Sequence, residues 1–138
     1  MSRRLRGKPV IAGRAEGTAL VSEQPLSFWG GLNPQTGEIT DRRHDRAGAV
    51  VTGRVFVFPT GKGSSTASAI LLESIKAGTA PAAIINHTTD PMLALAAIIA
   101  DELYQKSLPI VVLPEDELRT LREGDQIAIE PDGTVLVR

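Results

Sequence analysis

The 138-residue chain contains no cysteine. This absence excludes a disulfide framework, thiolate zinc sites, a cysteine nucleophile and an iron–sulfur cluster ligated within this chain. Histidine is nearly as scarce, with only His44 and His87 present. Two histidines leave little room for a histidine-based metal site, so the sequence predicts that this chain binds no metal.

Aromatic residues make up 4% of the chain and the net charge is −1. A small net charge and few stacking rings argue against a nucleic-acid-binding protein. Long hydrophobic runs are also missing, because the most apolar stretch, residues 91–99, is far shorter than the about 20 residues that span a bilayer. The basic start is not followed by an apolar segment of signal-peptide type. We therefore expect a cytoplasmic protein without nucleic-acid or membrane partners.

The length, the 42% hydrophobic residues and the 22% charged residues are typical of one globular domain. We expect a single domain over residues 1–138, with residues 1–9 as a flexible N-terminal tail. Turn signals crowd residues 23–49, and so long a loop-rich stretch is often a binding surface. Trp29, the only tryptophan, lies in this stretch beside Phe28.

Alternating strand and helix patterns follow this loop. The apolar, β-branched residues 49–58 predict a strand, and residues 65–76 predict a helix that ends before Gly78. Further signals predict a strand at 82–86, a helix at 91–104 capped by Asp90, a strand at 109–113 and a hairpin over 124–137. This order predicts an α/β fold with a central parallel βαβαβ unit and flanking antiparallel strands, arranged as a β/β/α sandwich.

Residues 59–68 form a glycine-rich turn between a predicted strand and a predicted helix. Gly61 and Gly63 let the backbone approach a ligand, Lys62 adds a positive charge, and Ser64 and Ser65 add hydroxyls. The turn is therefore predicted to bind an anion, such as a carboxylate or a phosphate. Alternatively, one of the two serines only caps the helix.

The turn does not match the common nucleotide signatures. A Walker A loop needs glycine at position 56 and a hydroxyl directly after the lysine, where this chain has Phe56 and Gly63. A dinucleotide fingerprint needs glycine at position 66, where this chain has Thr66. A serine of this turn could instead move protons, because the donors of a helix N-terminus can stabilise an alkoxide.

Four segments together resemble the small subunit, or swivelling domain, of the aconitase X family. These are LSFWGGLNPQTG at 26–37, TDRRH at 40–44, VFPTGKGSS at 57–65 and GTAPAA at 78–83. The resemblance extends from about Gly13 to Val137 and implies the swivelling β/β/α fold. Members of this family dehydrate small hydroxy acids, and their known substrate classes are cis-3-hydroxy-L-proline and (R)-5-phosphomevalonate.

The resemblance also implies a division of labour between two chains. A large subunit would bind an iron–sulfur cluster through its cysteines, and this chain would supply the serine base. The Gly-x-Gly-Ser motif of the family places that base at Ser64, with Gly61, Lys62, Gly63 and Ser65 as substrate-binding residues. Many relatives carry arginine where this chain has Lys62, and lysine lacks the planar bidentate grip on a carboxylate, which affects substrate preference.

Other residues admit a functional and a structural interpretation. Phe28 and Trp29 either face a partner or form a local core under the long loop. We expect His44 to be solvated, His87 to be a hydrogen-bonded structural residue at a strand end, and the 91–104 helix to be core. Two alternatives to the dehydratase remain: an anion-binding module that holds a phosphorylated metabolite without chemistry, and a structural adaptor.

Overall fold

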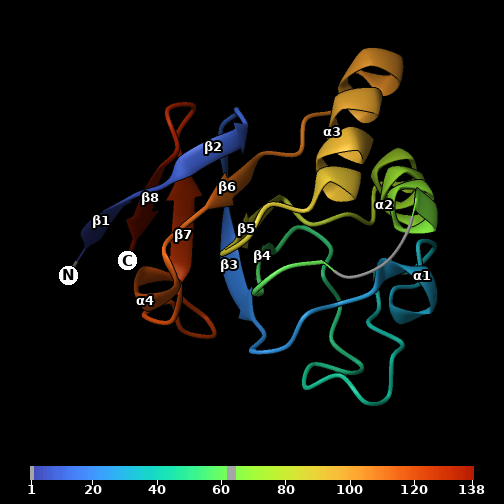
Figure 1. Ribbon diagram of the computed structural model, residues 1–138, viewed down its shortest axis with the longest axis horizontal. Coiled ribbons are helices and arrows are strands. Elements are labelled where there is room, and N and C mark those ends of the chain that lie inside the picture. The colour runs from blue at the N-terminus through green and yellow to red at the C-terminus, as the bar shows by residue number, and fades with distance from the viewer. Residues whose placement is uncertain (1, 62–64) are drawn as a thin grey trace.

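The structure is a computed structural model and describes residues 2–61 and 65–138 (Figure 1). Its elements in chain order are β1 (Arg3–Arg6), β2 (Lys8–Ile11), β3 (Ala15–Val21), α1 (Phe28–Gly31), β4 (Val55–Val57), α2 (Ser65–Ala77), β5 (Ala83–Asn86), α3 (Pro91–Tyr104), β6 (Ile110–Val112), α4 (Glu115–Leu118), β7 (Gln126–Ile129) and β8 (Thr134–Val137). Among the described residues, no helix is both long and apolar enough to cross a membrane.

Eight strands form one sheet in the order β1-β8-β7-β3-β4-β5-β6-β2. Strands β3, β4, β5 and β6 are parallel, and the remaining pairs are antiparallel. The two end strands, β1 and β2, are consecutive in the chain and only Gly7 separates them, so the sheet nearly closes on itself. A Cβ at Gly7 would lie 2.2 Å from Val111 Cγ1, so this crossing between the two ends requires glycine.

The N-terminal residues differ from the flexible tail predicted over residues 1–9. Arg3–Arg6 pairs with β8, and Lys8 and Pro9 pair with β6. The single apolar residue of β1, Leu5, packs against the core cluster between the two sheet layers. A strand with one apolar side chain among arginines carries almost no sequence signal, because its stability comes from pairing with distant strands.

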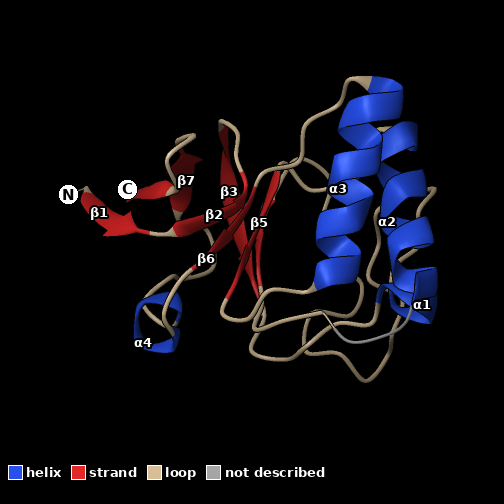
Figure 2. Cartoon of the chain, turned by 45° about the horizontal axis from the view of Figure 1, so that its top comes forward, coloured by secondary structure: helices blue, strands red, loops and turns tan. Residues whose placement is uncertain are grey.

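Figure 2 shows the parallel strands between helices α2 and α3 on one side and strands β1 and β7 on the other, as the β/β/α sandwich requires. Alternate residues point to opposite faces of a strand, so each parallel strand serves both layers. On β4, Phe56 packs in the cluster shared with α2 and α3, whereas Val55 and Val57 pack in the cluster shared with β7 and β8. The predicted α/β architecture is confirmed.

The two long helices confirm their sequence signals. Helix α3 starts at Pro91 with the Asp90 side chain accepting a hydrogen bond from Met92 N at 2.9 Å, and it ends at Tyr104 as predicted. The predicted 49–58 strand is shorter in the structure, where only Val55–Val57 belongs to the sheet. Gly53, with φ of 69°, forms a turn before β4, and this turn separates residues 49–51 from the strand.

Candidate functional site

The candidate site lies at the carboxyl ends of the parallel strands, where open α/β folds place their ligands. The chain leaves β4, passes Pro59 and Gly61, and reaches the start of α2 at Ser65. The carbonyl of Pro59 accepts hydrogen bonds from His87 N at 2.9 Å and Thr88 N at 3.2 Å. The segment after β4 is therefore fixed to the segment after β5, and two helix N-termini, those of α2 and α3, follow these segments.

Gly61 is in close contact with the N-terminus of α3. A Cβ at position 61 would lie 2.1 Å from Asp90 Oδ2 and 3.2 Å from Leu93 Cδ1, so any side chain there would displace the Asp90 carboxylate. Asp90 caps α3 with Oδ1, and this leaves Oδ2 directed at Gly61. The predicted close approach of backbone at Gly61 is thus present, and the group that approaches it is a carboxylate.

The remaining loop predictions fall on residues that the structure does not describe. Lys62, Gly63 and Ser64 lie outside the described residues, so the predictions for the base and for two substrate-binding residues stay predictions. Ser65 is the first residue of α2. The structure describes the residues on both sides of this loop. Gly61 lies against Asp90 before it, and the first turn of α2, a helix of 13 residues, follows it.

Asn86, which the sequence analysis did not select, is buried at the end of β5 with 0% of its surface exposed. Its amide nitrogen donates to the Phe58 carbonyl at 2.9 Å, while Oδ1 has no hydrogen-bond partner in the described part of the chain. Strand alternation puts Asn86 on the same face as Ile84, which packs with the helices. In the sequence, the signal that could have identified Asn86 is a polar residue at the end of an otherwise apolar strand.

Phe28 and Trp29, whose roles the sequence left open, differ in burial. Phe28 is 1% exposed, and its ring centroid lies 6.1 Å from that of Phe58, so it belongs to the core and does not face a partner. Trp29 is 63% exposed. Its ψ of 118° interrupts the short α1, and Gly30 follows with φ of 77°, so the turn projects the indole outward.

His44 is buried, which corrects the expectation of a solvated residue. His44 Nδ1 lies 3.1 Å from Arg46 N and 3.2 Å from Asp45 Oδ1, and Nε2 lies 3.1 Å from Ser22 Oγ. Ser22 Oγ in turn donates to Asp45 Oδ1 at 2.7 Å. These contacts join the end of β3 to the long loop.

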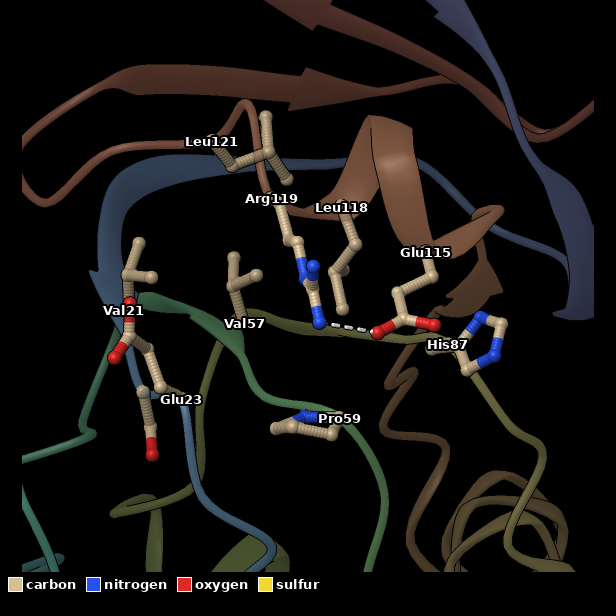
Figure 3. A pocket seen from close by; sticks show the side chains of 10 residues that line it. Val21, Glu23, Val57, Pro59, His87, Glu115, Leu118, Arg119 and Leu121 are labelled. Atoms are coloured by element: carbon tan, nitrogen blue, oxygen red, sulfur yellow. Dashed lines mark hydrogen bonds and ion pairs between the residues drawn. The ribbon is translucent and has the colours of Figure 1, made fainter.

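His87 and Pro59 line a cleft of about 580 Å³ (Figure 3). Leu113 O is 3.3 Å from His87 Nδ1, and a carbonyl can only accept, so Nδ1 carries the proton. This bond fits the predicted structural role. Glu115 and Arg119 form an ion pair in the same cleft, and Val21, Val57, Leu118 and Leu121 line the apolar wall.

A second polar network fixes the long loop to the sheet through Glu123. Val21 N–H donates to Oε1 at 2.8 Å, and Arg54 and Arg46 contact Oε2 at 2.7 and 2.8 Å. Burial raises the pKa of the Glu123 carboxyl, but the Val21 hydrogen bond and the two guanidinium groups outweigh it and lower the pKa below 4.5. The carboxylate thus connects β3 to two arginines of the segment before β4.

Comparison with known proteins identifies the family. Residues 4–137 match the family described as the aconitase X swivel domain. The chain belongs to this family. It is 47% identical over 113 residues to cis-3-hydroxy-L-proline dehydratase from Pseudomonas aeruginosa, a match that covers 80% of this chain and 20% of that protein. The chain therefore corresponds to a small part of that relative.

Other relatives of the aconitase X swivel domain are of similar length. The chain is 38% identical over 127 residues to phosphomevalonate dehydratase small subunit from Methanosarcina acetivorans, covering 91% of this chain and 84% of that protein. Thermococcus kodakaraensis aconitase X (holo-form) superposes with a TM-score of 0.88 at 35% identity, covering 99% of this chain and 98% of that one. The resemblance and the fold predicted from the sequence are confirmed.

The residues of this swivel domain do not fit an iron–sulfur cluster. The chain has no cysteine thiolate to ligate iron. Within residues 2–61 and 65–138, no three histidine, aspartate or glutamate side chains gather as a metal site. No step of the chemistry assigned to this chain involves an iron–sulfur cluster.

Proposed function

We propose that this chain is the small subunit of an aconitase X-type hydro-lyase. Together with a large subunit, it removes water from a small hydroxy acid, either cis-3-hydroxy-L-proline or (R)-5-phosphomevalonate. Support comes from relatives that are named dehydratases, one of them as a small subunit and another as a protein of which this chain matches only 20%. In this proposal the two subunits form a heterodimer, and the iron–sulfur cluster of the family belongs to the large one.

The observation that carries this proposal is the contact of Gly61, after β4, with Asp90 at the N-terminus of α3. Helix α2 starts at Ser65, four residues after Gly61. The unpaired N–H groups at the start of a helix favour a negative charge. Such a position can stabilise an oxyanion on the protein or a carboxylate on a substrate.

In the proposed reaction, Ser64 is the base. Its oxygen takes the proton from a substrate carbon, the electron pair of that C–H bond forms a C=C bond, and hydroxide leaves the neighbouring carbon. The product and one water together contain all the atoms of the substrate. Gly61, Lys62, Gly63 and Ser65 bind the substrate or stabilise the serine alkoxide, because N–H donors and a positive charge lower the pKa of a hydroxyl. We assign departure of the hydroxide to the side of the large subunit.

The test uses the complex of this chain with its large subunit, assayed for water loss from both candidate substrates. We expect Ser64→Ala to reduce kcat by at least about 100-fold, since a positioned base contributes about that much. Assembly of the complex and its iron content should not change. Ser27→Ala is the matched control, because Ser27 donates only to Trp29 O in an exposed turn.

Three outcomes would contradict this proposal. Full activity of the Ser64→Ala complex would favour a structural adaptor. Anion binding by the chain, without turnover by the assembled complex, would favour the non-catalytic module. Dehydration by the isolated chain in the absence of a large subunit would also overturn the two-subunit arrangement.

A further inference from the structure

One face of α3 packs in the core, whereas its outer face is both exposed and apolar. On the outer face, Leu95 is 42% exposed, Ile98 is 52% exposed and Leu103 is 63% exposed. Met92 and Ile99 lie on the same side of the helix, because residues three, four and seven apart share a helix face. These five residues are called the α3 stripe below.

Helix α2 shows how a solvent-facing helix of this protein differs from α3. The two helices pack together on the same side of the sheet and have similar lengths (Figure 2). The exposed residues of α2 include Thr66, Glu73 and Lys76, which suit contact with water. In α3 the only charged residues are Asp101 and Glu102, both in the last turn. An apolar face that continues through the preceding turns is typical of an interaction surface.

The charges of α3 argue against a membrane as the group that covers the α3 stripe. A helix that lies on a membrane carries lysine or arginine on its polar face, and these side chains are attracted by anionic lipids. Helix α3 contains neither residue type, and its two charged side chains, Asp101 and Glu102, are negative. The α3 stripe is therefore better suited to another protein surface.

The position of the α3 stripe favours the large subunit over a second copy of this chain. Helix α3 starts directly after Asp90, whose Oδ2 lies against Gly61 at the candidate site. In the proposed function the large subunit covers this site, so an interface that continues along α3 reaches Met92 first and then Leu95 and Ile98. The proposed heterodimer also requires such a surface, because only the contacts of the interface hold two separate chains together.

We propose that the α3 stripe is part of the surface that binds the large subunit of the hydro-lyase. Leu95, Ile98 and Leu103 lose their exposed apolar area on association, and this burial stabilises the complex. Asp101 and Glu102 lie beside the stripe, as charged residues do at the rim of an interface. This inference rests on the proposed function and names the surface through which the two subunits associate.

The first experiment measures the Kd of the complex formed from this chain and its large subunit. In the double variant Leu95→Gln/Ile98→Gln, two exposed apolar side chains become polar, while glutamine remains a good helix former. The isolated variant should therefore keep its stability, and the Kd should rise by about 10-fold or more. Val50→Gln is the matched control, because Val50 is 46% exposed but lies outside the helices, and it should leave the Kd unchanged.

The second experiment tests whether the stripe is covered in the complex. The chain has no cysteine, so Ile98→Cys introduces a single thiol whose labelling by a maleimide is followed by the mass of this chain. Binding of the large subunit should slow this labelling by about 10-fold or more, since a thiol must be accessible to react. Arg4→Cys is the control, because Arg4 is exposed on β1, across the sheet from the helices, and its labelling rate should not change (Figure 2).

The outcomes separate this inference from the proposed function. An active complex with an unchanged Kd in the double variant and unprotected Ile98→Cys would overturn the docking surface and leave the proposed function intact. Weaker binding by the double variant, in a wild-type complex that dehydrates neither candidate substrate, would support the docking surface and contradict the proposed function. A dimer of the isolated chain that the double substitution dissociates in sedimentation would assign the α3 stripe to a second copy. Absence of any binding to the large subunit would contradict both proposals.

Discussion

Two groups of polar side chains lie at the ends of neighbouring parallel strands, and they differ in how completely they are paired. At the end of β3, Ser22, His44 and Asp45 donate and accept among themselves and with nearby backbone N–H groups. At the ends of β4 and β5, Asn86 Oδ1 has no partner in the described chain and Asp90 Oδ2 faces a glycine. The paired group holds a loop in place, whereas the second group is incompletely paired within the described chain.

This contrast warns against recognising a site by residue type. Serine, histidine and aspartate together suggest a hydrolytic triad, yet the Ser22 hydroxyl donates to Asp45 Oδ1 at 2.7 Å. Each of these polar groups is satisfied inside the protein, so no substrate is needed to complete it. Asparagine and aspartate at the other strand ends suggest no familiar motif, but one of their acceptors has no partner in the described chain.

The largest effect on stability is expected at the paired group. His44→Ala leaves Arg46 N–H without its acceptor, removes one of the partners of Ser22 Oγ and opens a cavity in a buried position, so we expect it to lower the free energy of unfolding by about 2–3 kcal/mol. Chemical denaturation of the chain measures this loss. His87→Ala, at an exposed position, should cost less than about 0.5 kcal/mol. Equal losses of stability for His44→Ala and His87→Ala would show that the paired group contributes no more to stability than the exposed His87.

The next effect is expected at Gly61, in the incompletely paired group. Gly61→Ala places a methyl group against Asp90 Oδ2, and we expect a loss of about 1–2 kcal/mol together with a weaker cap on α3. Adding Asp90→Ala should relieve the clash, so the double variant should lose less than the sum of the single losses. Asp90→Asn keeps the bulk of the side chain and should give no such relief. Additive losses would show that the contact is unimportant.

Trp29 and Phe28 are neighbours in one turn, but only Phe28 is buried. Trp29→Ala removes an exposed indole, so the stability of the isolated chain should change by less than about 0.5 kcal/mol. If Trp29 contacts the large subunit, the Kd of the complex should rise by about 10-fold, as for an aromatic anchor at an interface. Calorimetric titration of the large subunit measures this change. An unchanged Kd would leave Trp29 outside the interface.

The smallest effect is expected at Glu123, and it depends on pH. The lowered pKa of Glu123 means that its contribution to stability is present above the unfolded value of 4.5 and disappears as the pH falls through the folded pKa. Glu123→Gln should therefore cost about 0.5–1 kcal/mol at pH 7, since the carboxylate is 42% exposed, and progressively less as the pH falls through the folded pKa. Denaturation over this pH range tests this, with Glu102→Gln as the exposed control. A loss independent of pH would contradict it.

Local patterns predicted the helices and the central strands well. Asp90 followed by proline marked the start of α3, and the structure has this cap. The alternation of strand and helix patterns predicted the parallel unit, because short connections and right-handed crossovers leave few other arrangements. The motif at residues 57–65 identified the family, although its central residues lie outside the described part of the chain.

Predictions that depended on distant contacts were less successful. His44 sits in a charged stretch and was expected in solvent, but Ser22 and Asp45 enclose it. The N-terminal strands were missed because β1 pairs with β8 at the other end of the chain. Asn86, at the end of an apolar strand, was not predicted as a notable residue. The feature that distinguishes it, the missing partner of Oδ1, depends on tertiary contacts.

The amino-acid sequence by itself determined the helix limits, the parallel core and membership of the aconitase X family, because caps, periodicity and motifs involve residues that are close along the chain. The tertiary structure alone decided which polar groups are paired, which member of the Phe28–Trp29 pair is buried, and which carboxylate approaches Gly61. Those outcomes depend on contacts between segments far apart in the sequence, and each contact exists only after the sheet has assembled and excluded water from its two faces.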